Sequence, residues 1–249
     1  MTHVIECPSG LRGEIRGLKV KELDYLADRR LAKSGQQLDR ILAGCWLETV
    51  DAGPYSLGER GLDWDQVLQG DRFYAMLEIR AASLGATYAF AAMCQGGACG
   101  CRFEWEVSLD ELPVRALSDD ARQNFRDGNR FESVLPGAAK RVWFRLPVGA
   151  DEKRLAKHRQ ARQGELWSTM LALRVVEIEG VAGGDKRRFL GELDLADAEH
   201  LRRAFDEADC GVETTIEVEC PECALVQDVE LPFDHGFFLA QRPKKGSSH

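Results

Sequence analysis

The sequence has no long apolar run, no excess of positive charge and few histidines. No apolar stretch approaches the roughly 18–20 residues that a membrane span needs, so we expect no membrane partner. The 33 basic and 41 acidic residues give a net charge of −8, which disfavours attraction to phosphate and therefore a nucleic-acid partner. The N-terminal stretch MTHVIECPSG lacks the apolar region of a secretory signal. We therefore expect the protein to begin in a cytoplasm, where disulfides are disfavoured.

The motifs of common catalytic sites are also absent. The sequence contains no GxxxxGK[ST] phosphate loop, no GxGxxG, no GxSxG elbow and no HExxH. It has only five histidines, and its carboxylates are spread over predicted helix faces without a pair suited to acid–base chemistry. These absences favour a protein that is not an enzyme and has no small-molecule substrate.

The 249 residues, 44% hydrophobic and 30% charged, are typical of a soluble globular protein that can bury a core. Their patterns predict an α+β fold with short antiparallel β-hairpins and about five or six helices. We expect one domain over residues 1–240, followed by a polar, disordered tail over 241–249. Its predicted parts are an N-terminal hairpin with helices (1–84), a first cysteine hairpin (86–113), a central hairpin with helices (130–208) and a second cysteine hairpin (212–233).

Several predicted elements carry specific expectations. Pro8-Ser9-Gly10 predicts the turn of the first hairpin, and Gly35 predicts a helix C-cap between helices at 19–34 and 37–50. A long helix is predicted within 64–85, with Asp71 as its candidate N-cap. A later helix, 194–209, is predicted to direct Leu195, Leu201 and Phe205 inward.

Cysteines are few and unevenly placed. Three of the eight lie between residues 94 and 101, and two more form the sequence CPEC. A pattern of helix, glycine, strand, cysteines, strand and Leu-Pro occurs over residues 70–113 and again over 195–232. This pattern predicts two similar hairpins, each with cysteines at its tip.

Each predicted hairpin tip offers half of a tetrahedral zinc site. Cys220 and Cys223 have the standard two-residue spacing, and Cys94 and Cys99 have an accepted wider one. We therefore expect these four cysteines to hold one structural Zn²⁺ in a zinc-ribbon-like element, although about 120 residues separate the two pairs. Cys101 is expected to point away on the opposite strand face. Cys7, Cys45 and Cys210 are read as small buried apolar residues, and His235 as a substitute ligand.

Three other interpretations of the cysteines stay open. They are reduced cysteines without a metal, a thiol redox protein that uses the Cys220/Cys223 pair, and a zinc-ribbon nucleic-acid binder. The segment after CPEC alternates like a strand, which disfavours a thioredoxin-like motif. Glu219, Glu222 and Asp228 would face phosphate, which disfavours nucleic acid.

Six segments in order carry a resemblance to a known family: ADRRLAKSG, GDRFYAMLEIRAASLGATYAF, CGCRFEWEVSL, FRLPVGADE, ECPEC and LPFDHGFF. Together they resemble the baseplate proteins of T-even-like contractile phage tails, a family that includes hub components and a hub-assembly factor. The resemblance covers residues 3–240. Family members tend to carry CxxCG and CxxC pairs. Here the first pair is widened to CQGGACG and Ala224 follows the second, so Cys101 stays an alternative ligand in the first pair.

The resemblance implies a non-enzymatic assembly factor or minor structural subunit of a baseplate hub, with hub proteins as its partners. It implies a location in the host cytoplasm during tail assembly, or retention in the virion baseplate. From the residues themselves, the apolar run Phe237, Phe238 and Leu239 is either a partner-docking segment or a cap on the core.

Overall fold

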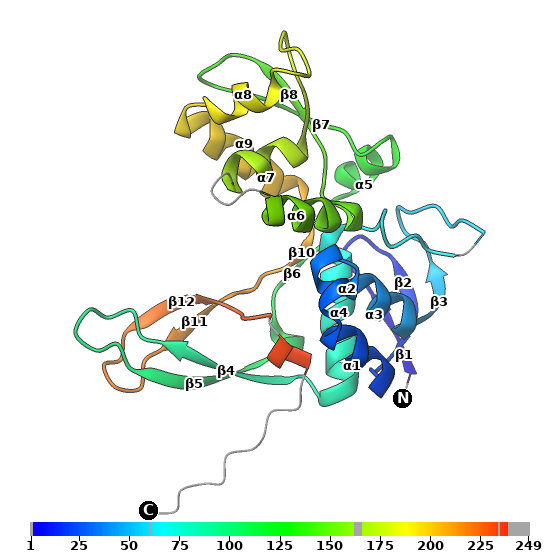
Figure 1. Ribbon diagram of the computed structural model, residues 1–249, viewed down its shortest axis with the longest axis vertical. Helices are drawn as coiled ribbons and strands as arrows, with labels where there is room; N and C mark the ends of the chain where they lie inside the picture. The colour runs from blue at the N-terminus through cyan, green and yellow to red at the C-terminus, as the bar shows by residue number, and fades with distance from the viewer. Residues whose placement is uncertain (1, 60, 162–165, 234, 239–249) are drawn as a thin grey trace, which may run out of the picture.

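The computed structural model describes residues 2–59, 61–161, 166–233 and 235–238, which are grouped around a central helix, α4 (Gln69–Leu84). Three bodies surround α4 (Figure 1): a sheet lobe (residues 2–59), an inserted lobe (residues 116–210) and an arm made of two hairpins. Helices and several small antiparallel sheets confirm the α+β class. The described residues form nine α-helices, more than the five or six expected.

The sheet lobe contains the predicted N-terminal hairpin. Strand β1 (Thr2–Glu6) pairs with β2 (Arg12–Arg16), and β2 pairs with β3 (Trp46–Asp51), all antiparallel. Helices α1 (Val20–Ala27), α2 (Arg29–Ser34) and α3 (Gln37–Cys45) complete the lobe. Alternation along β2 directs Ile15 inward, where it packs with Leu11, Ile41 and Leu42. Cys7 and Cys45 are buried in the same cluster, as predicted.

Two predicted helices of this lobe differ from the structure. The helix expected over 19–34 is divided at Asp28, whose carboxylate accepts a hydrogen bond from the Arg30 N–H at 2.7 Å and so caps α2. The helix expected over 37–50 ends at Cys45, because the strand-favouring residues that follow pair with β2 instead. Gly35 is the predicted C-cap, with a φ of 71°.

Asp71 is not the N-cap of α4, which begins at Gln69. Its carboxylate is fully buried in the first turn and accepts hydrogen bonds from the Ser9 N–H at 2.9 Å and the Tyr55 hydroxyl at 2.7 Å. The Ser9 hydroxyl donates a further bond. Burial raises the pKa of Asp71. The Asp71 carboxylate therefore joins α4 to the turn between β1 and β2, which contains Ser9, and to the loop before α4, which contains Tyr55.

Gly70 allows α4 to approach β10 (Gly211–Val212) closely. A Cβ at Gly70 would press on the Cys210 backbone carbonyl, well inside van der Waals contact.

We expect Gly70→Ala to lower the free energy of unfolding by about 1–3 kcal/mol, although alanine is the better helix former by about 1 kcal/mol. The matched control is Gly191→Ala at the exposed end of α8 (Lys186–Gly191), where a Cβ meets nothing within 4 Å. Denaturant unfolding of both variants checks this, and equal stabilities would contradict the close approach.

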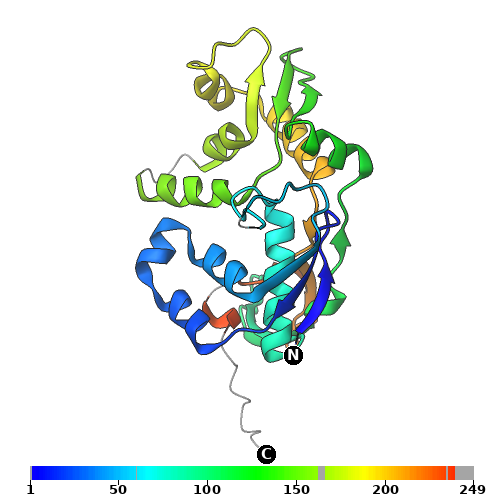
Figure 2. The same cartoon turned by 90° about the vertical axis from the view of Figure 1, so that its right-hand side faces the viewer.

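The inserted lobe begins and ends at one short ladder. Strand β6 (Val114–Arg115) pairs with β10, so that Arg115 faces Gly211. Figure 2 shows the lobe stacked above the sheet lobe. Strands β7, β8 and β9 form its sheet, which confirms the predicted central hairpin. Its elements are α5 (Asp119–Arg126), β7 (Phe131–Val134), β8 (Arg141–Phe144), α6 (Gly149–Ala161), α7 (Leu166–Arg174), β9 (Val175–Ile178), α8 (Lys186–Gly191) and α9 (Leu195–Ala208).

The core of the inserted lobe forms where α9 packs on this sheet. Phe205 of α9 contacts Phe144 of β8, with ring centroids 4.9 Å apart, and Leu201 is fully buried beside them. Leu195, expected to point inward, is 83% exposed at the first residue of the helix. Cys210 is buried in this cluster, as predicted.

A buried arginine joins the two lobes at α4. Arg72 has no exposed side-chain surface, and its guanidinium lies 2.7 Å from Glu152 of α6 and 2.9 Å from Asp39 of α3. It also donates a hydrogen bond to the Trp64 carbonyl at 2.8 Å. Lys153 contacts Asp39 at 2.6 Å, which adds a second cation. One ionic network therefore spans the sheet lobe, α4 and the inserted lobe.

The C-terminal 3-10 helix η2 (His235–Phe238) covers the core next to α4. Phe237 is fully buried, Phe238 is 8% exposed, and the Arg80 guanidinium donates to the Phe237 carbonyl at 3.3 Å. The partner-docking hypothesis was therefore wrong for these two residues, which cap the core. Leu239, the tail over 241–249 and the side chain of His235 lie outside the described residues. Throughout the described chain, every helix falls short of the length and apolarity that a bilayer crossing requires.

Candidate metal centre

The arm consists of two antiparallel hairpins that lie side by side (Figure 1). Strands β4 (Thr87–Met93) and β5 (Arg102–Ser108), followed by the 3-10 helix η1 (Leu109–Glu111), form the first; β11 (Thr215–Glu219) and β12 (Val226–Glu230) form the second. The predicted repeat is thus present as two hairpins. They are separate two-stranded sheets without a shared ladder. Their inner faces pack together through Phe90, Phe103 and Val218.

The structure brings the four predicted cysteines together at the end of the arm. The sulfurs of Cys94, Cys99, Cys220 and Cys223 all lie within 4.8 Å of one another. Cys94 Sγ is 3.6 Å from Cys223 Sγ, and Cys99 Sγ is 3.9 Å from Cys220 Sγ. Each of these contacts crosses from one hairpin to the other. The cluster therefore joins chain segments more than 100 residues apart.

These sulfur distances agree with a tetrahedral site. Two sulfurs bound to one zinc at about 2.3 Å each lie about 3.8 Å apart. The two cross-hairpin distances, 3.6 and 3.9 Å, fall on either side of this value. Four thiols are a soft donor set of the kind that zinc and iron select in proteins. The residues present therefore fit a thiophilic metal ion whose four coordination positions are all taken by cysteine sulfurs.

The two tips have the same backbone design. The Cys94 N–H donates to the Cys101 carbonyl at 2.8 Å, and the Cys220 N–H donates to the Leu225 carbonyl at 2.9 Å. The residue after the second cysteine has a positive φ in both tips, 57° at Gly100 and 54° at Ala224. The first tip has two more residues in its turn but closes in the same way. Cys94 thus corresponds to Cys220, Cys99 to Cys223, and Cys101 to Leu225.

Contrary to the prediction from the sequence, Cys101 does not point away from the other cysteines. Its sulfur lies 3.3 Å from that of Cys220, on the opposite hairpin. The prediction applied strand alternation across Gly100, but the positive φ of Gly100 turns the chain and cancels the alternation. Five thiols therefore gather at the tip, of which four have the positions of knuckle ligands.

The pKa values of the clustered thiols are shifted in different directions. The Cys220 sulfur is desolvated, but the backbone N–H groups of Cys223 and Glu222 outweigh this and lower its pKa to about 6. Hydrogen bonding to Cys220 raises the pKa of Cys101 to about 12. Backbone donors around Cys220 thus stabilise a thiolate, which is the form that binds a metal.

Sequence reasoning missed Gln227, a buried side chain that joins the two tips. Its amide accepts a hydrogen bond from the Gln95 N–H and donates one to the Met93 carbonyl, both at 2.8 Å. Alternation along β12 places Gln227 on the same face as Val229, which points inward. A polar residue at an inward position of a strand could therefore have indicated this contact from the sequence. Gln227 holds the two hairpins together independently of the cysteines.

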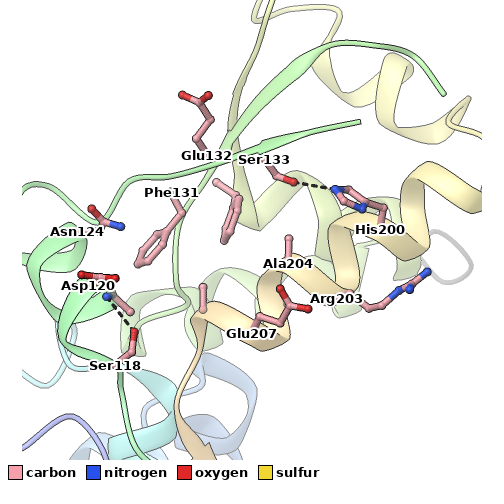
Figure 3. A pocket seen from close by; sticks show the side chains of 13 residues that line it. Ser118, Asp120, Asn124, Phe131, Glu132, Ser133, His200, Arg203, Ala204 and Glu207 are labelled. Atoms are coloured by element: carbon pink, nitrogen blue, oxygen red, sulfur yellow. Dashed lines mark hydrogen bonds between the residues drawn. The ribbon is translucent and has the colours of Figure 1, made fainter. Parts of the chain in front are cut away.

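A separate polar pocket lies in the inserted lobe between α5, β7 and α9 (Figure 3). The Ser133 hydroxyl lies 3.0 Å from Nε2 of His200, and Glu132 points away from this pair. In the portion of the chain that the structure describes, His200 has no carboxylate partner of the kind that orients histidine in a Ser-His-Asp triad. The pair therefore serves as a contact between α9 and β7.

Comparison with known proteins adds one match. The family described as T4 bacteriophage base plate protein matches residues 28–239. No curated protein and no solved structure matches the chain. The matched region includes α4, the inserted lobe, the whole arm and all five clustered cysteines. The chain therefore belongs to the T4 bacteriophage base plate protein family, which indicates a structural or assembly role in a phage baseplate.

Proposed function

We propose that this protein is a non-enzymatic assembly factor or minor structural subunit of the hub of a contractile tail baseplate, and that it acts by protein–protein contact on a scaffold stapled by zinc. Membership of the base plate family supports contact with other baseplate proteins and association with the phage tail. Hub proteins are the proposed partners. Assembly would take place in the host cytoplasm, and a retained subunit would remain in the virion baseplate.

The observation that carries this proposal is the arm. Its two hairpins project from the body (Figure 1) and share no strand pairing, so packing, Gln227 and the cysteines must hold them together. Bound zinc would supply the missing rigidity through the Cys94, Cys99, Cys220 and Cys223 thiolates. Because all four coordination positions would be protein sulfurs, the metal would be structural and leave no position for a substrate.

The surface of the arm suits contact with another protein. At its end, Met93 is 67% exposed, Val226 55% and Leu225 38%. Acidic side chains flank this apolar tip, and Glu217 lies directly opposite Asp228 in the strand register. Like charges in that position destabilise a sheet, so their presence favours a role at the surface. The acidic charge also argues against the zinc-ribbon nucleic-acid alternative.

We expect Met93→Asp combined with Val226→Asp to lower the yield of assembled tails at least about tenfold, which corresponds to a loss of about 1.4 kcal/mol at an interface. The test is complementation of a phage or prophage in which this gene is deleted, with tails counted by electron microscopy. Val50→Asp is the matched control, because Val50 is 54% exposed on β3 of the sheet lobe.

The metal content of the double variant should equal that of the unmodified protein, since both side chains are exposed and neither is a proposed ligand. A normal tail yield from a folded double variant would refute the arm tip as the contact surface. Mass spectrometry of purified tails separates the two forms of the proposal: a retained subunit is found in the particle, whereas an assembly factor is not.

A further inference from the structure

Cys101 is a fifth thiol that the proposed zinc site does not need. Its counterpart in the second tip is Leu225, and both residues accept the hydrogen bond that closes their turn. The four ligand positions are filled by the other cysteines. Cys101 is half-buried and packs against the core of the arm, and its sulfur is 3.3 Å from a ligand of the opposite hairpin.

The Cys101 and Cys220 sulfurs are 3.3 Å apart. This distance is shorter than the two sulfur–sulfur distances between proposed ligands of opposite hairpins, 3.6 and 3.9 Å. A disulfide requires sulfurs about 2.05 Å apart, so closure needs a movement of little more than about 1 Å. Cys220 is 1% exposed, whereas Cys101 is only partly buried. Cys223 is more exposed than Cys101, but zinc would hold it together with the other three ligands. Cys101 is therefore the thiol of the cluster that stays available to a small oxidant, with which it reacts slowly because its pKa is raised.

We propose that a hydroperoxide oxidises Cys101 and that Cys220 then forms a disulfide with it, so that a covalent link between the hairpins replaces the metal. This inference rests on the zinc site of the proposed function. It assigns a modification site to the pair Cys101 and Cys220, which differs from a dithiol within CPEC because the bond joins the two hairpins.

The chemistry balances with hydrogen peroxide as the oxidant. The Cys101 thiol and one peroxide give a sulfenic acid and one water. The Cys220 thiolate then attacks the sulfenic sulfur, which forms the S–S bond, breaks the S–O bond and expels hydroxide, which takes a proton to become water. The two sulfurs lose two electrons and the peroxide gains them. Loss of the Cys220 thiolate would leave a bound zinc with three protein ligands, so the metal would dissociate and the three remaining thiolates would take up protons.

A disulfide between Cys101 and Cys220 would keep the two hairpins of the arm joined after the metal has been lost. The reducing cytoplasm maintains thiols, whereas the medium outside a lysed cell is oxidising and favours disulfides. Because the bond would join the same two hairpins as the metal, oxidation would exchange one staple for another. The arm is therefore expected to remain folded after the zinc has left.

The test uses the full chain, purified without a metal-affinity tag, loaded with one equivalent of zinc and treated with hydrogen peroxide. Released zinc is followed with a chromogenic chelator, disulfides are mapped by mass spectrometry without reduction, and hydrogen exchange is measured over the arm. The variants are Cys101→Leu, which introduces the residue of the second tip, and Cys101→Ala as a smaller replacement. Cys45→Ala, a buried cysteine outside the arm, is the matched control.

We expect the unmodified protein and Cys45→Ala to release one zinc, form the Cys101–Cys220 bond and keep slow exchange in the arm. Cys101→Leu and Cys101→Ala should bind one zinc, release it at least about tenfold more slowly, and lose slow exchange once it is released. Release at an unchanged rate, or a disulfide that joins Cys94 with Cys223, would overturn the inference. Loss of zinc binding in both Cys101 variants would do the same, because Cys101 would then be a ligand. If the unmodified protein binds no zinc, the proposed staple fails, and the disulfide map still reports separately on the thiol pair.

Discussion

Replacing Cys223 by serine is expected to abolish stoichiometric metal binding and to release the arm, with amide exchange in β11 and β12 faster by about a hundredfold or more. Cys223 is exposed, so serine removes very little packing at this position. Its sulfur is nevertheless one of four in the cluster and contacts Cys94 across the two hairpins. Structural zinc stabilises a fold by its binding free energy, and three thiolates hold it far less tightly than four.

The measurements are elemental analysis and hydrogen exchange by mass spectrometry, with Glu222→Gln as the control inside the same turn. The control should bind one metal per chain and exchange slowly, because its side chain is not a proposed ligand. Exchange in β1, β2 and β3 should be the same in both variants, since the buried residues around these strands form a cluster apart from that of the arm. A Cys223→Ser protein with full metal content and a slowly exchanging arm is incompatible with a four-sulfur staple.

Arg72→Met is expected to lower the free energy of unfolding by about 3–5 kcal/mol, which is the cost of removing one partner from a buried ion pair. The Arg72 guanidinium has no exposed surface and contacts Glu152, Asp39 and the Trp64 carbonyl. Methionine fills the space of the arginine stem but leaves two carboxylates facing each other without this cation. We expect the inserted lobe and the sheet lobe to separate before either unfolds.

Arg188→Met is the matched control for this variant. Arg188 also contacts a carboxylate, Glu192 at 3.7 Å, but both side chains are more than 70% exposed. Exposed pairs of this kind contribute about 0–1 kcal/mol. Chemical denaturation of both variants, followed by circular dichroism, gives the comparison. Equal losses would mean that the position of Arg72 between the lobes adds nothing to stability.

Local sequence patterns were sufficient to predict the hairpins, most helices and the two cysteine pairs. Alternation and helical spacing depend on neighbouring residues, and the repeated order of elements suggested that Cys94 and Cys99 meet Cys220 and Cys223, as the structure shows. That these cysteines bind a metal stays a prediction.

Contacts between distant residues could not be predicted in this way. Arg72 and Glu152 are 80 positions apart, and nothing near either residue indicates the other. The same applies to Gln227, whose partners are 132 and 134 positions away. Cys101 was misplaced for a different reason, because a glycine at positive φ reverses the strand pattern just before it. Asp71 was misread as a cap because acidic residues near a helix start usually are caps, whereas here the carboxylate is buried on Ser9 and Tyr55.

The short ladder between β6 and β10 has a consequence for the order of folding. The entropic cost of bringing two chain segments together grows with the logarithm of the loop between them, and about 120 residues separate the two cysteine tips. Once Val114 faces Val212, only about ten residues on each side remain between this ladder and the nearest clustered cysteine, Cys101 or Cys220. The inserted lobe can therefore fold first and deliver both hairpins to one place. Lengthening a surface loop of that lobe should leave the rate of arm closure almost unchanged, whereas breaking the β6–β10 ladder should slow it.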